Sequence, residues 1–160
     1  LKLGDYFNSG MLLMNMKELR NVHLAEHFLY LLNKYHFDCV APDQDYLNSM
    51  CYGKIEYLDS CWDAMPNRNK PEIENPKIIH YNLFDKPWCY DDIQYQDYFW
   101  EYAKQSVYYD KIKAYKAAYT DKQKEDDHAH LLDLFRRAGT NADTEVTFRK
   151  VLESGEKVRL

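Results

Sequence analysis

The sequence predicts an α/β fold that is followed by a helical tail. In the first 80 residues, short apolar runs bounded by turns alternate with an amphipathic stretch, which is the pattern of strands and helices in one domain. After residue 96, only helical periodicity remains. The length of 160 residues, with 46% hydrophobic and 29% charged residues, is typical of a folded globular chain.

The first strand and the first helices are predicted within residues 6–50. Residues 6–15 form a short apolar run around a small-polar turn, which is typical of a buried strand. Residues 16–37 carry apolar side chains at helical spacing. That face consists of Leu24, Phe28, Leu31, Leu32 and Tyr35. Pro42 and the acidic residues behind it predict a short helix over 43–50, which ends before Gly53.

Two more strands and further helices are predicted along the rest of the chain. Residues 54–58 alternate in polarity like a half-buried strand, and residues 77–81 form another short strand. The prolines of residues 66–76 indicate a surface loop between them. Residues 96–139 show helical stripes that end at Gly139. So few strands form an incomplete sheet, and its exposed edge would favour self-association.

The charge balance argues against a nucleic-acid partner. The net charge is −5 and the isoelectric point is about 5.7, whereas general nucleic-acid binders are basic. Residues 1–110 hold 10 basic and 17 acidic side chains, and residues 111–160 hold 11 and 9. This mildly basic end gives only weak support to peripheral association with an anionic membrane, which usually needs a cluster of about four to eight basic residues.

The cysteines and the start of the chain predict a cytoplasmic location, with the inner face of the membrane as a further option. The four cysteines include no Cys-x-x-Cys pair, so zinc-ribbon and thioredoxin-type sites are not expected. No signal sequence or membrane-spanning apolar run is visible. The chain starts at Leu1 without a methionine, which suggests a piece of a longer protein.

Three segments concentrate polar groups at predicted element ends, where α/β proteins build their sites. They are Tyr6-Phe7-Asn8-Ser9-Gly10, then Asp43-Gln44-Asp45, and then His80 followed by Lys86-Pro87-Trp88. Taken singly, each has a structural interpretation as a turn, a helix cap or a satisfied histidine. Their occurrence together and in this order favours a site.

The set YFNSGMLLMNMKELR, DQDYLN, IIHY and KPW resembles glycosyltransferase family 8, over residues 5 to about 104. The resemblance implies that residues 1–95 are the C-terminal, acceptor-side part of a GT-A domain, the nucleotide-diphospho-sugar transferase fold. Residues 96–160 would be a helical C-terminal extension. It further implies a retaining enzyme that moves a hexose from a UDP-sugar to a saccharide acceptor in cell-surface polysaccharide or lipopolysaccharide synthesis.

The resemblance also assigns a metal ligand and a phosphate contact. His80 matches a ligand of Mn²⁺ or Mg²⁺, and Lys86 matches a lysine that contacts the donor diphosphate. Asp43-Gln44-Asp45 has the letters of the family's Asp-x-Asp metal motif but matches a later motif of the family. The motif that completes the metal site therefore has no counterpart in this chain, and the isolated chain is expected to be inactive. Many members carry glycine three residues after the metal histidine, whereas this chain has Leu83.

The remaining assignments concern the sugar. Asn8 matches a residue that contacts the transferred sugar, and Gly10 would let the backbone approach it closely. Asp43 matches a carboxylate that binds donor-sugar hydroxyls, and Gln44 matches the residue beneath the reacting face. Because an amide is a poor nucleophile, Gln44 is expected to stabilise an oxocarbenium-like state. The alternative is a non-catalytic α/β plus helical module that binds a partner chain or a glycan through its aromatic surface.

Overall fold

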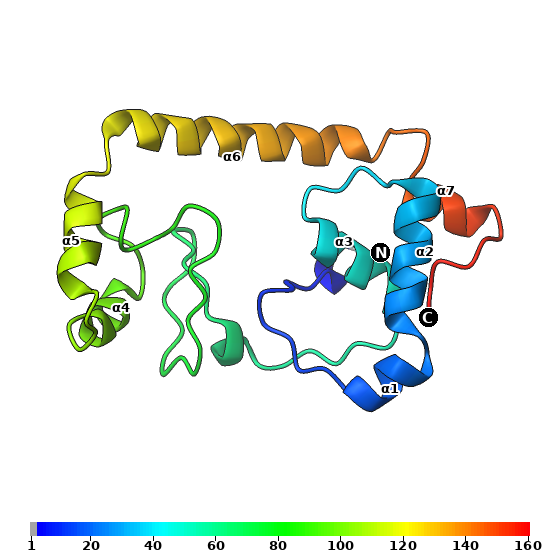
Figure 1. Ribbon diagram of the computed structural model, residues 1–160, viewed down its shortest axis with the longest axis horizontal. Helices are drawn as coiled ribbons and strands as arrows, with labels where there is room; N and C mark the ends of the chain where they lie inside the picture. Colours follow the sequence, from blue (N-terminus) through cyan, green and yellow to red (C-terminus); the bar gives the residue numbers. More distant parts are fainter. Residues whose placement is uncertain (1–2) are drawn as a thin grey trace. The chain divides into compact units, whose positions relative to one another are not determined.

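The computed structural model describes residues 3–160 as helices joined by long irregular segments (Figure 1). The helices are η1 (Leu3–Asp5), α1 (Met16–Asn21), α2 (Leu24–Tyr35), α3 (Pro42–Met50), η2 (Ser60–Asp63), α4 (Gln96–Ala103), α5 (Tyr109–Ala117), α6 (Asp121–Asn141) and α7 (Phe148–Glu153). Among these described residues, no helix is both long enough and apolar enough to cross a membrane.

The α/β prediction is wrong for the described residues, and with it the assignment of a GT-A half. The segments predicted as strands, 6–15, 54–58 and 77–81, are irregular there, and the one pairing is an isolated parallel bridge between Ala64 and Ile79. A strand needs a neighbour for its backbone hydrogen bonds, and only the last of these segments finds one. Self-association through a sheet edge therefore loses its structural basis.

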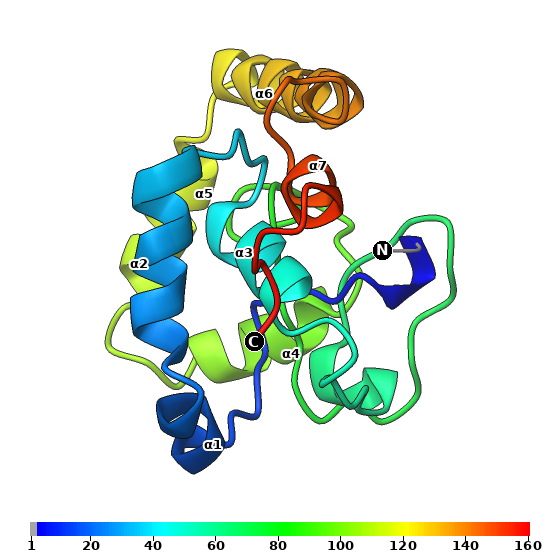
Figure 2. The ribbon, with the colours of Figure 1, turned by 90° about the vertical axis from the view of Figure 1, so that its right-hand side faces the viewer.

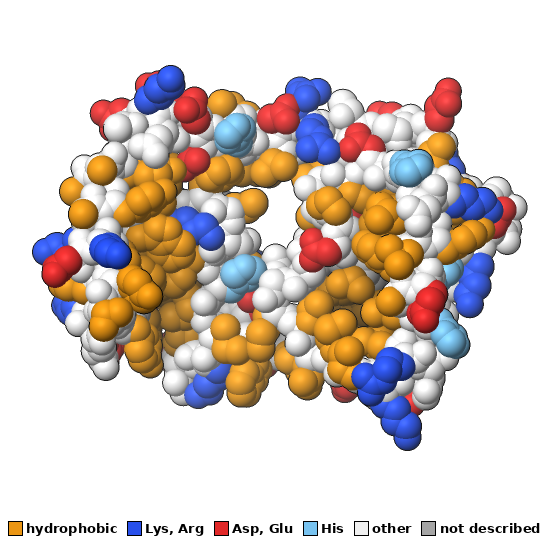
Figure 3. Space-filling view, in the orientation of Figure 1, with side chains coloured by type: hydrophobic (Ala, Val, Ile, Leu, Met, Phe, Trp, Pro, Cys, Tyr) orange, Lys and Arg blue, Asp and Glu red, His pale blue; other side chains and the backbone are white. Residues whose placement is uncertain are grey.

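The chain divides into two compact units. One comprises the residues up to Tyr57 together with Leu131–Leu160, and the other comprises Leu58–His130. The division falls within α6. On the face that Figure 3 shows, hydrophobic side chains lie exposed among charged ones in both units.

The helical predictions for the first unit hold, with one interruption. The stretch predicted as helical over 16–37 is divided into α1 and α2, because His23 adopts a left-handed conformation with a φ of 55°. The short helix predicted over 43–50 is confirmed as α3. Pro42 occupies its first turn, where a missing N–H costs nothing, and acidic side chains there favour the helix dipole.

The C-terminal residues complete the core of the first unit. The buried cluster consists of Leu31, Phe37, Tyr46, Met50, Val151 and Val158. Phe148 of α7 stacks on Phe37 with ring centroids 3.9 Å apart and meets Tyr46 edge-on at 4.9 Å. The backbone N–H of Leu160 donates to Met50 O (2.9 Å), and Figure 2 shows this end of the chain beside α3. Helix α3, which contains the DQDYLN motif, is therefore supported by residues about 100 positions further along the chain.

The second unit is held by aromatic packing around an irregular backbone. Its buried side chains include Ala64, Cys89, Ile93, Tyr95 and Ala103. Rings of Tyr81, Trp88, Phe99 and Trp100 contact one another in sequence, mostly edge-on. Side chains replace the missing sheet in satisfying the backbone here; for example, Tyr95 OH accepts from the N–H of Ile73 (2.7 Å).

Candidate functional site

In the first unit, the loop of residues 6–10 lies on the N-terminal turn of α3. Ser9 makes the closest connection, because its N–H donates to Gln44 Oε1 (2.9 Å) and its hydroxyl donates to Asp43 Oδ2 (2.7 Å). The first predicted motif is thereby bound to the second, although about 35 residues separate them. The structure thus brings together two of the three polar segments.

The buried amide of Asn48 fixes this loop. Its side chain is part of the core, and the residue is only 1% exposed. Asn48 Oδ1 accepts from Phe7 N–H, while Nδ2 donates to the carbonyls of Phe7 and Gln44, each at 2.8 Å. One side chain therefore satisfies both backbone groups of Phe7, which would otherwise lack partners at this helix surface.

Tyr6 and Asp45 close the other side of the site. The Tyr6 hydroxyl donates to Asp45 Oδ1 and accepts from Gln44 Nε2 (3.1 Å). Asp45 Oδ2 in turn accepts from the N–H groups of Val40 and Ala41, at 3.0 and 3.2 Å. Burial, together with the hydrogen bond to Asp45, raises the pKa of Tyr6 to about 12. Tyr6 is therefore a hydrogen-bonding phenol at neutral pH.

All four residues predicted to contact the sugar lie in this cluster. Asn8 Oδ1 accepts from the N–H of Gly10 (2.7 Å), so the pair forms a tight polar turn at the exposed rim of the site. Asp43 is exposed, and its Oδ1 is the oxygen that Ser9 leaves free for a ligand. Gln44 is held at both ends of its amide, by Ser9 and Tyr6. The cluster offers a carboxylate and amide groups, which suit the hydroxyls of a sugar.

His80 lies in the second unit, next to the bridge between Ala64 and Ile79. Its N–H donates to Ala64 O (2.9 Å), and its Nδ1 lies 3.1 Å from Asp63 Oδ1. A carboxylate on one ring nitrogen orients the other, Nε2, as a ligand, which is the usual arrangement behind a metal-bound histidine. The described residues nevertheless contain no group of three or more acidic, histidine or cysteine side chains placed to hold a metal. This donor set alone therefore does not fit a retained divalent cation.

Lys86 also lies in the second unit and is engaged within its own loop. Its ammonium donates to Tyr81 O and lies 5.4 Å from the centre of the Trp88 ring. Leu83, which stands where many family members carry glycine, has a φ of 41° and is exposed. A positive φ is strained for a residue with a side chain, whereas glycine adopts it readily. The backbone at Leu83 therefore has a conformation that glycine would adopt without strain.

Lys116 of α5 holds the loop that follows Lys86. Its ammonium donates to the carbonyls of Pro87 (2.9 Å) and Tyr90 (2.6 Å) and pairs with Asp91 Oδ1 (2.9 Å). The hydrogen bond and charge of Lys116 lower the pKa of Asp91. The loop beginning with Lys86-Pro87-Trp88 is therefore fastened to a helix outside the predicted motifs.

Sequence reasoning missed the supporting residues of both units. They are Asn48, Asp63 and Lys116. Asn48 has one signal, since it lies four residues after Gln44 and thus on the same helical face. Asp63 and Lys116 have none, because each meets its partner only through the folding of an irregular segment.

Comparison with known proteins places the chain in a family. The model of glycosyl transferase family 8 matches residues 2–92, so the chain belongs to that family, as its motifs predict. It is 29% identical to lipopolysaccharide 1,2-glucosyltransferase of Escherichia coli, over 54% of this chain and 29% of that protein. It is 28% identical to general stress protein A of Bacillus subtilis, over 53% and 36%.

A protein of Haemophilus influenzae named as a glycosyltransferase is 31% identical, over 52% of this chain and 28% of its own length. The chain thus spans about a third of the length of the curated relatives that it matches. No solved structure matches it. The matched region contains both the Asp43–Gln44 cluster and the His80–Lys86 loop, and it ends before α4.

Proposed function

We propose that this chain is the acceptor-side part of a retaining glycosyltransferase that moves a hexose from a UDP-sugar to a saccharide acceptor. The observation that carries the proposal is the cluster of Asn8, Ser9, Asp43 and Gln44 on the first turn of α3. Membership of family 8 supports the transferase class. The name of the E. coli relative supports an acceptor in lipopolysaccharide synthesis. We also propose a cytoplasmic location, in keeping with the free cysteines of the chain.

In this proposal, Asp43 and Asn8 bind and orient the donor sugar. Asp43 Oδ1 accepts a sugar hydroxyl while Oδ2 stays with Ser9, so the carboxylate is already aligned before the sugar arrives. Asn8 presents its amide N–H groups, because its oxygen is occupied by Gly10. Gly10 adds no side chain at the exposed rim, and the backbone can approach the ligand there.

Gln44 stabilises the positive charge that develops on the sugar. The Ser9 N–H holds its Oε1, and its Nε2 is directed to Tyr6, so the amide dipole is fixed before the reaction begins. A fixed dipole stabilises developing charge without a cost of reorganisation. An amide is also too weak a nucleophile for double displacement, which favours attack and departure on the same face.

His80 and Lys86 serve the donor diphosphate in the longer enzyme. His80 supplies one imidazole ligand to Mn²⁺ or Mg²⁺, whose other ligands come from outside residues 3–160, and Asp63 orients the ring. A bound cation supplies charge neutralisation for the departing diphosphate. Lys86 adds a point charge once its ammonium leaves the Tyr81 carbonyl.

Turnover of UDP-glucose and UDP-galactose by the full-length protein that carries this chain tests the proposal. We expect Gln44→Ala to lower kcat about 10-fold or more with little change in donor affinity, because the lost interaction belongs to the transition state. His80→Ala is expected to raise the Mn²⁺ concentration needed for half-maximal turnover. Gln105→Ala, at an exposed position whose amide donates to Glu101 O, is the matched control for Gln44.

Two outcomes would contradict the proposal. The assigned role of Gln44 is wrong if donor affinity falls and kcat does not. A full-length protein that binds glycans but transfers no sugar, with or without added metal, would support the non-catalytic module instead.

A further inference from the structure

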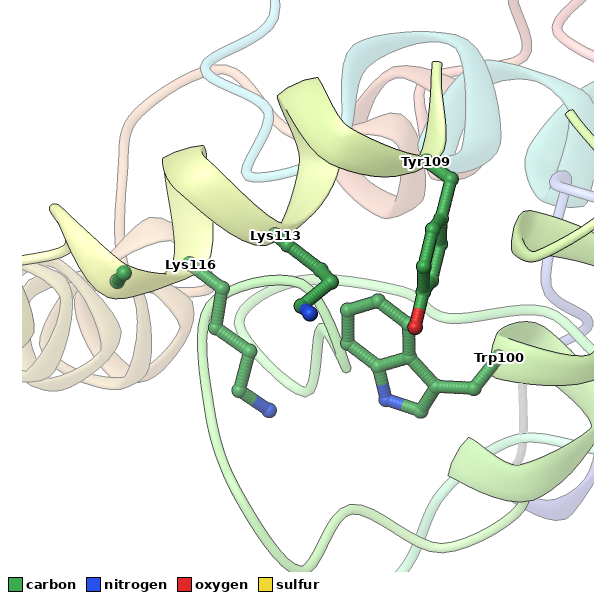
Figure 4. Close-up of a pocket in the computed structure, with 5 residues that line it drawn as sticks. Trp100, Tyr109, Lys113 and Lys116 are labelled. Atoms are coloured by element: carbon green, nitrogen blue, oxygen red, sulfur yellow. The ribbon is translucent and has the colours of Figure 1, made fainter. Parts of the chain in front are cut away.

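An open pocket between α4 and α5 lies outside the residues that the family model matches. It has a volume of about 380 Å³ and is lined by Trp100, Tyr109, Lys113, Lys116 and Ala117 (Figure 4). All five belong to the second unit. This volume is near the lower end of about 300–1,000 Å³ for small-molecule sites, so one sugar residue suits it better than a long chain.

The two lysines of the pocket differ in what they can offer. The ammonium of Lys116 is held by two carbonyls and Asp91, so it positions the wall and contributes little free charge. Lys113 has no acidic partner among residues 3–160 and lies 5.4 Å from the centre of the Tyr109 ring. Figure 4 shows it reaching over the pocket toward Trp100. The pocket therefore presents one unpaired positive charge in a chain of net charge −5.

The aromatic side chains of the pocket indicate what the uncharged part of a ligand would be. The rings of Trp100 and Tyr109 lie nearly perpendicular, at 80°, with centroids 6.5 Å apart. The ammonium of Lys116 lies over one face of the Trp100 ring, 5.3 Å from its centre, so an apolar ligand surface would pack against the rest of this corner. Ring faces attract polarised C–H groups such as those of a pyranose. The Tyr109 hydroxyl points into this corner and has no hydrogen-bond partner among the described residues, so it is available to a sugar hydroxyl.

We propose that this pocket binds a hexose that carries a phosphate or a carboxylate. The anionic group pairs with Lys113, the C–H face of the ring stacks in the aromatic corner, and Tyr109 donates to a ring hydroxyl. The choice of a sugar rests on the proposed function, because that function requires a saccharide acceptor. The pairing with Lys113 rests on the pocket alone.

Calorimetry and NMR on the 160-residue chain test this binding without any transfer reaction. Glucose 6-phosphate and glucuronate are the probes, with methyl glucoside, inorganic phosphate and UDP as comparisons. The chain has three tryptophans, and we expect the indole N–H signal of Trp100 to shift while those of Trp62 and Trp88 do not. We expect Lys113→Gln to weaken both anionic sugars about fivefold or more, and Tyr109→Phe to weaken them about threefold.

Lys111→Gln is the matched control, because Lys111 lies on the same helix, has the same charge and contacts Tyr108 outside the pocket. It is expected to leave affinity unchanged. Equal binding of methyl glucoside would overturn the anionic assignment, and equal binding of inorganic phosphate would overturn the sugar assignment. Tighter binding of UDP at Trp100, or no shift with any probe at about 20 mM, would overturn the proposal as a whole. None of these results depends on whether the longer enzyme transfers sugar.

Discussion

At the scale of single residues, the site depends on side chains that contact the backbone more than on those that face a ligand. Asn48 satisfies both peptide groups of Phe7 and also reaches Gln44 O. Tyr6 connects Gln44 to Asp45, which in turn caps the peptide groups before α3. These bonds explain how a loop without a neighbouring strand keeps one position.

Replacement of Asn48 by alanine should destabilise the first unit. Three hydrogen bonds of the buried Asn48 amide disappear, and partly buried backbone groups of Phe7 are left without partners, so the free energy of unfolding should fall by about 3 kcal/mol. Urea unfolding followed by circular dichroism measures the loss. Asn33→Ala, at an exposed position of α2, should change it by less than about 0.5 kcal/mol. A loss below about 1 kcal/mol for Asn48→Ala would show that water replaces the amide.

Tyr6 should make the free energy of unfolding fall at alkaline pH. Its pKa is raised to about 12 in the folded chain, from an ordinary value of 10.0, because burial and Asp45 favour the protonated phenol. Its contribution is therefore complete below pH 10 and is lost as the pH rises toward 12. The difference in unfolding free energy between the native chain and Tyr6→Phe should be constant up to about pH 9 and shrink above pH 10. Urea titrations at a series of pH values test this, and a difference that stays constant to pH 11.5 would contradict it.

At the scale of elements, α3 and α7 pack together in the core of the first unit. The N-terminal turn of α3 carries Asp43 and Gln44, while its buried side contributes Tyr46 and Met50 to the core. Helix α7 is only six residues long and depends on that core and on Thr147, whose side chain caps it by accepting from Lys150 N–H (3.2 Å). The C-terminal helix thus supports the helix that positions the site.

Phe148→Ala should show this coupling. Its ring contacts both Phe37 and Tyr46, so its removal should cost about 3 kcal/mol in the unfolding of the first unit. Arg149→Ala, next to it on the exposed face of α7, should cost less than about 0.5 kcal/mol. Equal effects of the two variants in urea unfolding would mean that α7 does not belong to the core.

At the scale of the whole molecule, the first unit is discontinuous in sequence. Residues 131–160 return to complete it, and Arg137 binds both the side chain of Asp38 and the carbonyl of Cys39, at 3.0 and 3.1 Å. Near the end of the chain, a ring nitrogen of His27 lies 2.9 Å from Val158 O. The second unit is continuous and contains its own buried side chains.

Deletion of residues 144–160 should therefore affect the two units differently. It removes Phe148, Val151 and Val158 from the first core, so amide protons of α2 and α3 should lose most of their protection. Amide protons around Tyr95 and Ala103 in the second unit should keep theirs. Hydrogen exchange measured by mass spectrometry distinguishes the two. Equal loss of protection in both units would show that they unfold as one.

The sequence predicts the local parts of this protein well. Proline and acidic residues specify the start of α3, and helical spacing specifies α2, because both depend on neighbours within a few residues. The prediction of strands fails because an apolar segment forms a strand only beside a partner, and residues 3–160 provide one bridge. Of the six predicted site residues, Asn8, Gly10, Asp43 and Gln44 share one cluster, and His80 and Lys86 belong to the other unit.

The amino-acid sequence by itself determined the family, because the identity and order of the motif residues are a property of the chain and need no fold to be read. Only the tertiary structure decided that the polar loop rests on α3 through Asn48, that residues 131–160 belong to the first core, and that the second unit is held by aromatic contacts. The physical reason is that hydrogen bonds and buried surface between distant segments depend on where the backbone passes, which no local pattern specifies.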